Sequence, residues 1–426
     1  MKRRIALRCL FAAFLFLSFG SLKAQYLLNS DSAFKAGAAN SGRLWGYMFG
    51  DLYYKAHSDS LNRGGSNQYT GIPKTRNAFQ FRRIYLGYDY NITSKFSAEL
   101  LLAAEDNFPT GAPVSNVAVA ANTPQSGAGD LTGDGKLTFY IKLANIRWKN
   151  IWKGTDLIVG QVATPAFPLL SEKIWAYRSI ERTISDIRRT PSYDFGATLQ
   201  GKFDAKGNFG YDFMVGNGSS AKPESDNFKW FYGDVFAMFA DKKLIFDLYA
   251  DYERLAWTPA LHHSRQMLKG FAAYNTPGLT IGVEGFVNNL KNDVTATKIA
   301  GGTSLLSNRA KGLSLYIHGN IVPNRLRFFA RYDMYNPNSE INNSIYSKYA
   351  QTTGNYNDNS YAGGTTATGD ETYKQNFITA GLDFTPAKNV HFMPNIWYNH
   401  YATQLATANG DYDIVYRATF YFTFGK

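Results

Sequence analysis

The sequence predicts an all-β fold, a transmembrane outer-membrane β-barrel of about 16 antiparallel strands with an inserted third loop. Three observations lead to this prediction: an N-terminal secretion signal, an alternation of apolar and polar residues along many segments, and an alternation of long and short connections between those segments. Secretion carries the chain into the cell envelope, and the two alternations describe strands that close into a ring.

Residues 1–24 predict a secretory signal peptide. The first eight residues include four basic residues and no acid, and an apolar run from Cys9 to Gly20 follows. Ala24 is a small residue suited to the position before cleavage. The apolar run is too short for a spanning helix, although an uncleaved anchor is the alternative. We expect the mature chain, residues 25–426, to form the barrel.

The composition of the mature chain excludes several kinds of site. Cys9, the one cysteine, lies inside the signal, so disulfides, cysteine metal sites and a cysteine nucleophile are excluded. The signal holds five basic residues, so the formal net charge falls from +12 to +7, and the other basic residues form no run that would track nucleic acid. The chain has 29 Tyr, 31 Phe and 38 Gly, yet its mean hydropathy is negative. This combination is typical of a barrel with a lipid-facing band and a wet interior.

Period-two alternation is clearest in the segment 193–203. A strand sends alternate side chains to opposite faces, so this segment has one apolar and one polar face. Segments 81–92, 244–254, 313–321 and 326–335 repeat the pattern. A soluble sandwich would show the same alternation. In 193–203 the apolar face holds Tyr193, Phe195, Ala197, Leu199 and Phe203, and the polar face holds Asp194, Gly196, Thr198, Gln200 and Lys202.

The connections favour a barrel over a sandwich, because long gaps and short turns alternate strictly along the chain. Long extracellular loops and short periplasmic turns produce this rhythm on an even-stranded barrel and leave both chain ends on the short-turn side. The predicted strands are 43–55, 80–92, 95–106, 136–148, 156–162, 193–203, 208–216, 229–240, 244–254, 266–275, 279–289, 311–322, 326–336, 373–384, 390–401 and 413–424. The long gaps are 56–79, 107–135, 163–192, 217–228, 255–265, 290–310, 337–372 and 402–412.

The predicted width implies an open interior. A barrel of about 16 strands encloses an aqueous channel, whereas eight strands leave an interior filled by side chains. Residues 25–42 precede the first strand and are too few for a plug domain. The last strand, 413–424, has aromatic residues on one face and resembles the signal by which outer-membrane barrels are recognised for insertion. We expect the protein to lie in the outer membrane of a Gram-negative bacterium.

The third long gap, 163–192, is the candidate constriction because it mixes five cations with three acids. Inside a pore these residues would form an electrostatic filter, since Arg and Lys rings favour anions. A solvated outer loop or a short surface helix is the alternative, and the residues by themselves leave both open. The charged residues are Glu172, Lys173, Arg178, Glu181, Arg182, Asp186, Arg188 and Arg189.

Several motifs carry a resemblance to a known family. They are GQxxxP at 160–165, YRxxER at 177–182, YDFGATLQGKF at 193–203, YDFMVGNG at 211–218, RFFARYDMYNP at 327–337 and HFMPNIWYNHY at 391–401. Through them most of the mature chain resembles the phosphate-selective porin O/P family in its Bacteroidetes-type branch. The resemblance implies a homotrimeric porin whose third loop folds into the channel and whose lumenal Arg and Lys residues conduct anions.

The resemblance also points to individual positions. Glu172, Glu181 and Asp186 interrupt the cations of the third loop, whereas phosphate-selective members have a dense set of lumenal cations. This departure favours a general anion preference over dedicated phosphate selectivity. The implied constriction cations are Lys173, Arg178, Arg182, Arg188 and Arg189, and the wall candidates that the pleat points inward are Arg83, Lys202, Arg327, Arg331 and Arg417.

We expect no enzyme, metal site or cofactor. The pair His262 and His263 falls in a predicted loop, where such a dipeptide rarely binds a metal. Ser314 and His318 share a strand face and are more simply explained as wall residues of a wet lumen than as a catalytic pair. The segment 130–135 resembles the start of a calcium loop but lacks the glutamate expected at its twelfth position.

The leading functional prediction is passive diffusion of small hydrophilic solutes through a pore, with anions preferred and phosphate among them. The alternative is a structural or interaction barrel of a secretion or adhesion assembly. In that case the Tyr/Asn/Gly-rich gap 337–372 would be its recognition surface. A barrel hydrolase ranks last.

Overall fold

The computed structural model describes residues 39–61, 63, 68–70, 72–105, 137–188, 192–224, 226–258, 261–351, 373–404 and 409–425. The predicted signal peptide, Arg189 and the segment 130–135 lie outside these residues.

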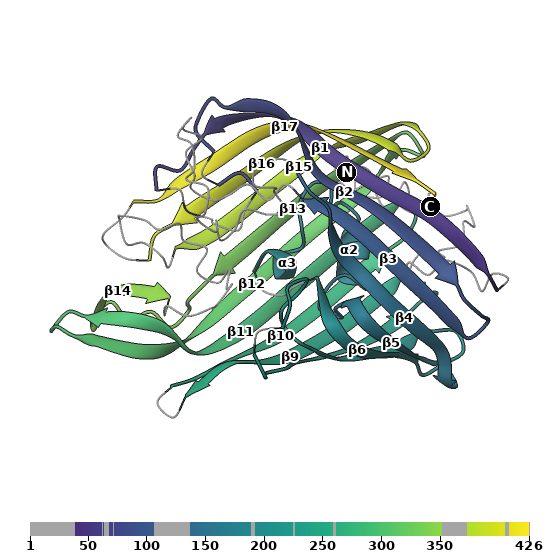
Figure 1. The fold of residues 1–426 in the computed structure, drawn as a ribbon. Helices are drawn as coiled ribbons and strands as arrows, with labels where there is room; N and C mark the ends of the chain where they lie inside the picture. The colour runs from purple at the N-terminus through teal and green to yellow at the C-terminus, as the bar shows by residue number, and fades with distance from the viewer. Residues whose placement is uncertain are drawn as a thin grey trace, which may run out of the picture.

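Seventeen strands form one antiparallel sheet in the described part of the chain, and sixteen of them build the wall of a closed barrel (Figure 1). The wall strands are β1 (Ser41–His57), β2 (Asn77–Asn91), β3 (Phe96–Glu105), β4 (Tyr140–Trp152), β5 (Thr155–Ala163), β6 (Tyr193–Lys202), β7 (Phe209–Gly216), β8 (Trp230–Phe239), β9 (Leu244–Thr258), β10 (Leu261–Asn275), β11 (Leu279–Lys298), β12 (Thr303–Val322), β13 (Leu326–Asn336), β15 (Lys374–Ala387), β16 (Val390–Ala402) and β17 (Asp411–Phe424). β1 pairs with both β2 and β17, so the ring has no free edge. The predicted fold class is confirmed.

The remaining strand, β14 (Tyr346–Gln351), lies outside the wall. It pairs with the outer end of β11, while β13 pairs directly with β15 across the connection that contains β14. β14 therefore widens the projecting β11–β12 hairpin into a small sheet at the long-connection end of the barrel (Figure 1).

Two of the predicted long gaps, 255–265 and 290–310, are wrong. Most of these residues belong to paired strands: β9 runs to Thr258 and β10 begins at Leu261, while β11 runs to Lys298 and β12 begins at Thr303. A transmembrane strand needs only about 9–11 residues, so β11 and β12 extend beyond the membrane. There the outward face needs no apolar side chains, so the alternation fades although the backbone pairing continues.

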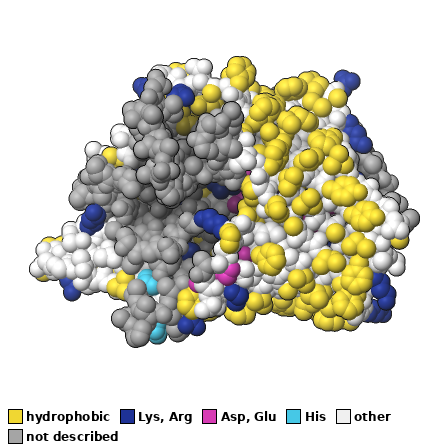
Figure 2. All heavy atoms as spheres, in the orientation of Figure 1, with side chains coloured by type: hydrophobic (Ala, Val, Ile, Leu, Met, Phe, Trp, Pro, Cys, Tyr) yellow, Lys and Arg dark blue, Asp and Glu magenta, His cyan; other side chains and the backbone are white. Residues whose placement is uncertain are grey.

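The wall alternates as the sequence predicts, with polar side chains inside and apolar side chains outside. On β6 Asp194 is 0% exposed and its neighbour Phe195 is 53% exposed, and on β9 Asp247 and Leu248 differ in the same way. Figure 2 shows hydrophobic side chains gathered over the outer face of the strands, with Lys and Arg side chains toward its margins. A surface of this kind requires a lipid environment, because water would leave that apolar area unburied.

The seven short turns that join the wall strands gather at one end of the barrel, and both described chain ends lie there too. A two-residue turn joins β4 to β5, where Gly154 has φ +82°, a conformation that residues with a Cβ rarely adopt. Aromatic side chains ring the outer surface at this end. The ring centroids of Phe203 and Tyr211 are 4.9 Å apart with the rings tilted by 40°, and Phe209 meets Phe239 edge-on at 5.6 Å. Such girdles mark the interface between lipid and water.

Among the described residues, no helix is both long and apolar enough to cross a membrane. The described residues contain two short helices, both in the third long connection: α2 (Ser171–Trp175) and α3 (Ile184–Arg188). They lie within the ring of strands rather than over its mouth (Figure 1).

Candidate functional site

The third connection, described over residues 164–188, is inserted into the barrel lumen. Its backbone carbonyls accept hydrogen bonds from side chains of distant wall strands: Ile180 from Arg417 at 3.1 Å, and Ile174 from the His318 ring at 3.0 Å. Likewise, the backbone carbonyl of Ser179 accepts a hydrogen bond from Arg82, and that of Arg182 accepts one from Arg331. Four strands therefore hold the connection inside, and the alternative of a solvated outer loop is excluded.

One face of the connection is apolar and packs against half of the inner wall. Trp175 is fully buried at the centre of this contact, with its ring 5.0 Å from Tyr316. Leu170, Ile174, Tyr177 and Ile180 complete the loop side of the cluster. The wall side comes from β8–β10, β12, β13 and β16 and consists of Met238, Ile245, Phe271, Ala273, Tyr316, Phe329 and Met393.

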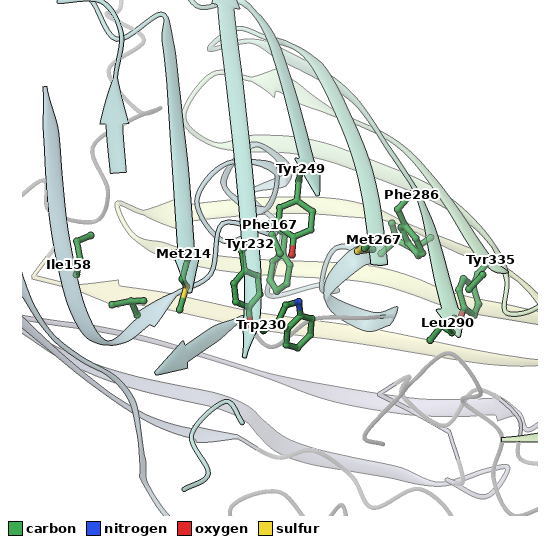
Figure 3. Close-up of a cluster of buried hydrophobic side chains, with 14 residues drawn as sticks. Ile158, Phe167, Met214, Trp230, Tyr232, Tyr249, Met267, Phe286, Leu290 and Tyr335 are labelled. Atoms are coloured by element: carbon green, nitrogen blue, oxygen red, sulfur yellow. The ribbon is translucent and has the colours of Figure 1, made fainter. Parts of the chain in front are cut away.

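A second apolar cluster fastens the connection where it enters and leaves the lumen. Phe167 lies beside Tyr232 and Tyr249 of the wall (Figure 3). Ile184 of α3 belongs to the same cluster. The cluster also includes side chains of β5 and of β7–β13, so apolar packing joins the connection to these strands.

The opposite face of the connection is charged. Arg178 donates to Glu172 at 2.7 Å and also pairs with Asp186. Burial raises the pKa of Glu172, with Asp186 adding to the shift and Arg178 opposing it. Burial lowers the pKa of Arg178, but Asp186 and Glu172 outweigh it, so the pKa is raised well above its ordinary value. We call Glu172, Arg178 and Asp186 the loop trio; its formal charge is −1.

A charged group of opposite sign stands on the facing wall. Glu105 of β3 accepts hydrogen bonds from Lys142 of β4 at 2.6 Å and from the Tyr85 hydroxyl at 2.9 Å, and it pairs with Arg83 of β2. We call Arg83, Glu105 and Lys142 the wall trio; its formal charge is +1. The guanidinium of Arg178 interacts electrostatically with both the Glu105 carboxylate and the Arg83 guanidinium.

A cavity of about 330 Å³ separates the charged face of the connection from the wall of β1–β7. It is lined near the short-turn end by Asp89 and Lys149, and near the long-connection end by Tyr193. Glu172, Arg178 and Lys142 line its middle. This cavity, on one side of the lumen, is the candidate functional site, and we call it the passage.

The predicted site residues divide into two groups in the structure. Arg178, Asp186, Glu172 and Arg83 belong to the two trios, and Arg182 lies 3.9 Å from Glu181 beside them. Lys173 lines the passage and a second cavity of about 260 Å³ toward the short-turn end. Lys202 borders that second cavity at the exposed end of β6.

The other candidates hold the connection in place instead of facing the passage. Glu181 accepts a hydrogen bond from Trp397 at 2.9 Å, and Arg188 lies over the Tyr335 ring and bonds to Gln375. Arg331 pairs with Asp333 and covers Trp175. Arg327 donates to His318 and Tyr177, and Arg417 donates to Ile180.

Sequence reasoning missed Arg82 and Lys142. β2 contains a β-bulge: Phe49 of β1 pairs with Arg83, and the next residue, Gly50, pairs with Phe81. Arg82 is the extra residue, and both Arg82 and Arg83 are buried inside the barrel. Strict alternation assigns only one of two neighbours to the lumen, so it could not have found Arg82. Lys142 lies at a second bulge, where Leu101 pairs with Leu143 and Leu102 pairs with Ile141, so Lys142 and its neighbour Leu143 both face inside. Strict alternation would have assigned Lys142 to the lipid face.

The first long connection also folds inward, which the sequence did not indicate. Lys55 pairs with Asp413 at 2.9 Å with both side chains buried, and Tyr69 donates to Asp51 at 2.7 Å. Arg63 is fully buried against Asp59. This connection packs beside β15–β17, so the lumen is narrowed from a second side.

The histidines do not form a catalytic arrangement in the described residues. His318 uses both ring nitrogens in structural contacts, one with the Ile174 carbonyl and one with Arg327. His262 and His263 lie in β10, not in a loop as the sequence suggested. No group of three or more metal-ligating side chains occurs in the part of the chain that the structure describes.

Comparisons with known proteins show the fold. No protein-family model matches the chain, and no curated protein matches it in sequence. Three similar solved structures are the outer membrane channel DcaP of Acinetobacter baumannii (10% identity, TM-score 0.55, 91% of this chain and 98% of that one), OmpF of Salmonella typhi in complex with daunomycin (11%, 0.53, 91% and 98%) and OmpT of Vibrio cholerae (10%, 0.52, 91% and 99%). The chain has a porin-type outer-membrane fold and lies in the outer membrane of a Gram-negative bacterium.

Proposed function

We propose that the protein is a porin through which small hydrophilic solutes diffuse passively. The observation that carries the proposal is the passage between the charged face of the third connection and the wall of β1–β7. Polar groups line it at several levels, with Asp89 and Lys149 toward the short-turn end and Tyr193 toward the long-connection end, so a hydrated solute finds hydrogen-bond partners at each level. The likeness to the channel DcaP and to OmpF supports the same function.

We propose further that the passage prefers anions, and only gently. Five cations and four acids line the cavity, so cations exceed acids by one. The two trios have opposite net charges and cancel each other in the middle. Phosphate is the specific anion that the resemblance to the phosphate-selective porin O/P family suggests. The mixed charges on the third connection favour small anions in general.

Ion current across a planar lipid bilayer tests both parts of this proposal. Purified protein should give stepwise conductance, and a salt gradient should give a reversal potential of the sign that a modest anion preference produces. A strong cation preference would contradict the proposed selectivity. Absence of conductance, with stoichiometric co-purifying proteins, would instead favour a structural barrel of a secretion or adhesion assembly.

The resemblance also suggests a homotrimer, which we propose as the assembled form. Native mass spectrometry of protein extracted in mild detergent should give the mass of three chains. A monomer that conducts in the bilayer would refute the trimer while leaving the porin function intact.

A further inference from the structure

A row of aromatic rings follows the passage from the short-turn end toward the long-connection end. Trp45 stacks with Tyr47 at 6.3 Å between ring centroids and an angle of 8°, and Tyr47 meets Tyr85 of the next strand at 4.4 Å. The ammonium of Lys142 lies 5.0 Å from the Tyr85 ring and 4.9 Å from the Tyr193 ring, and so joins the two. Trp45, Tyr47, Tyr85 and Tyr193 form what we call the aromatic row.

Two members of the row present their rings to the passage. All four residues line the cavity, but Tyr47 and Tyr193 are half-buried and keep part of their surface exposed, whereas Trp45 and Tyr85 are almost fully buried. Trp45 lies flat against the wall because Gly87 on the next strand has no Cβ, which would stand 2.3 Å from the indole ring. The wall is therefore shaped to hold the rings in position.

Charged hydrogen-bonding groups flank the aromatic row on both sides. Lys142 and Tyr85 bring the wall trio to its edge, and Glu172 and Arg178 of the loop trio line the opposite side of the same cavity. The charges of the two trios sum to zero, so the middle of the passage gives an ion little net electrostatic stabilisation, and hydrogen bonding is the main interaction offered to a solute there. Each hydroxyl group of a solute both donates and accepts hydrogen bonds. The carboxylates of the trios accept such bonds and the guanidinium groups donate them, so adjacent hydroxyl groups find both kinds of partner.

From this combination we infer that the passage binds and conducts sugars, neutral solutes whose rings are apolar on their faces and hydroxylated at their edges. The C–H face of a sugar ring packs on Tyr47 or Tyr193, while its hydroxyl groups exchange hydrogen bonds with the trios. A solute can move from one ring to the next along the row without losing contact. The inference rests on the proposed porin function and specifies a solute class for it.

Sugar block of the ion current in a planar bilayer tests this inference, with maltotriose as the probe. Maltotriose should reduce the current through the full-length protein in a saturable way. Polyethylene glycol of matched hydrodynamic radius, which has no ring, should reduce it only as it reduces the conductivity of the bulk solution. Equal block by both solutes, or block that does not saturate, would overturn the inference.

Paired variants separate ring stacking from simple filling of space. Tyr47→Leu with Tyr193→Leu should raise the half-blocking concentration about tenfold, while Tyr47→Phe with Tyr193→Phe should keep it within about twofold, because only the first pair removes the rings. An unchanged half-blocking concentration in the Leu pair would contradict the role of the aromatic row.

If the unmodified protein does not conduct, the porin proposal fails. Tryptophan fluorescence titration of detergent-solubilised protein with maltotriose then tests sugar binding by itself, because Trp45 stacks on Tyr47. No saturable change would overturn the inference.

Discussion

The guanidinium of Arg417, on the last strand, donates a hydrogen bond of 3.1 Å to the backbone carbonyl of Ile180 in the third connection. The two residues are 237 positions apart in sequence. Arg417 also lies over the ring of Tyr69, whose loop packs beside β15–β17. One side chain therefore fastens two inserted connections to the strand that closes the barrel, and the width of the passage depends on such long-range contacts.

Replacing Arg178 should make the passage prefer cations. In Arg178→Gln the carboxylates of Glu172 and Asp186 lose their shared partner and face the solute uncompensated. The reversal potential in a salt gradient should move toward the cation side. Arg309→Gln is the matched control, because Arg309 pairs with Glu340 at an exposed site on the projecting hairpin. An unchanged reversal potential in Arg178→Gln would place Arg178 outside the conducting path.

Replacing Glu105 should shift selectivity in the opposite direction. Glu105→Gln removes the carboxylate that Lys142 and Arg83 share, so both cations act on the passage. Anion preference should increase over that of the unmodified protein under the same gradient. A shift of the same sign in Glu105→Gln and Arg178→Gln would show that the two trios do not oppose each other across one passage.

Selectivity should depend on pH through Glu172. Burial raises the pKa of this carboxyl above the ordinary value of about 4.3, so as pH falls it is protonated earlier than an exposed glutamate. Protonation removes one negative charge from the loop trio, so anion preference should increase as the pH is lowered. Reversal potentials measured over a pH series should show this step.

The Glu172→Gln variant is the check on that assignment. It should already have the stronger anion preference at neutral pH and should lose the step. Glu340→Gln, at an exposed site, should keep it. Retention of the full step in Glu172→Gln would assign the titration to another group.

Trp175 should be needed to hold the third connection in the lumen. The indole is fully buried against Tyr316 and beneath Arg331, so Trp175→Ala leaves a cavity that costs about 3–5 kcal/mol of local stability. We expect larger and noisier single-channel conductance together with a lower thermal unfolding midpoint. Ile299→Ala is the control, since that side chain is 61% exposed and should change neither quantity.

The N-terminus of the mature protein should be Gln25. The basic start, apolar run and small Ala24 predict cleavage after that alanine. Intact mass and N-terminal peptide mass of protein isolated from outer membranes would check the position. A chain that retains residues 1–24 would instead support the uncleaved anchor.

Strand number and the gathering of short turns at one end could be predicted because both follow from local patterns. Alternation such as that of Asp194 and Phe195 arises wherever a strand separates the aqueous lumen from lipid. Short turns such as the one at Gly154 recur along the sequence between pairs of alternating segments. The prediction failed at 290–310, beyond the membrane, because no lipid constrains the outer face of a strand there.

The composition of the site was only partly predictable. The charged residues of the third connection were recognisable as a group, but the sequence could not tell Arg178, which faces the passage, from Arg188, which lies over Tyr335. The connection has no regular period to assign its side chains to faces. Arg82 escaped detection for a related reason, because a bulge interrupts the period of β2.

The amino-acid sequence by itself determined that this protein is a barrel of about sixteen strands with an apolar exterior, since the solvents on the two faces of each strand dictate the pattern residue by residue. The tertiary structure decided what fills that barrel. Contacts such as those of Trp175 with Tyr316, and of Arg417 with Ile180, join residues more than a hundred positions apart. Such pairs form only once the ring closes, because closure brings distant strands around one lumen, and they leave a passage along β1–β7 that no local pattern encodes.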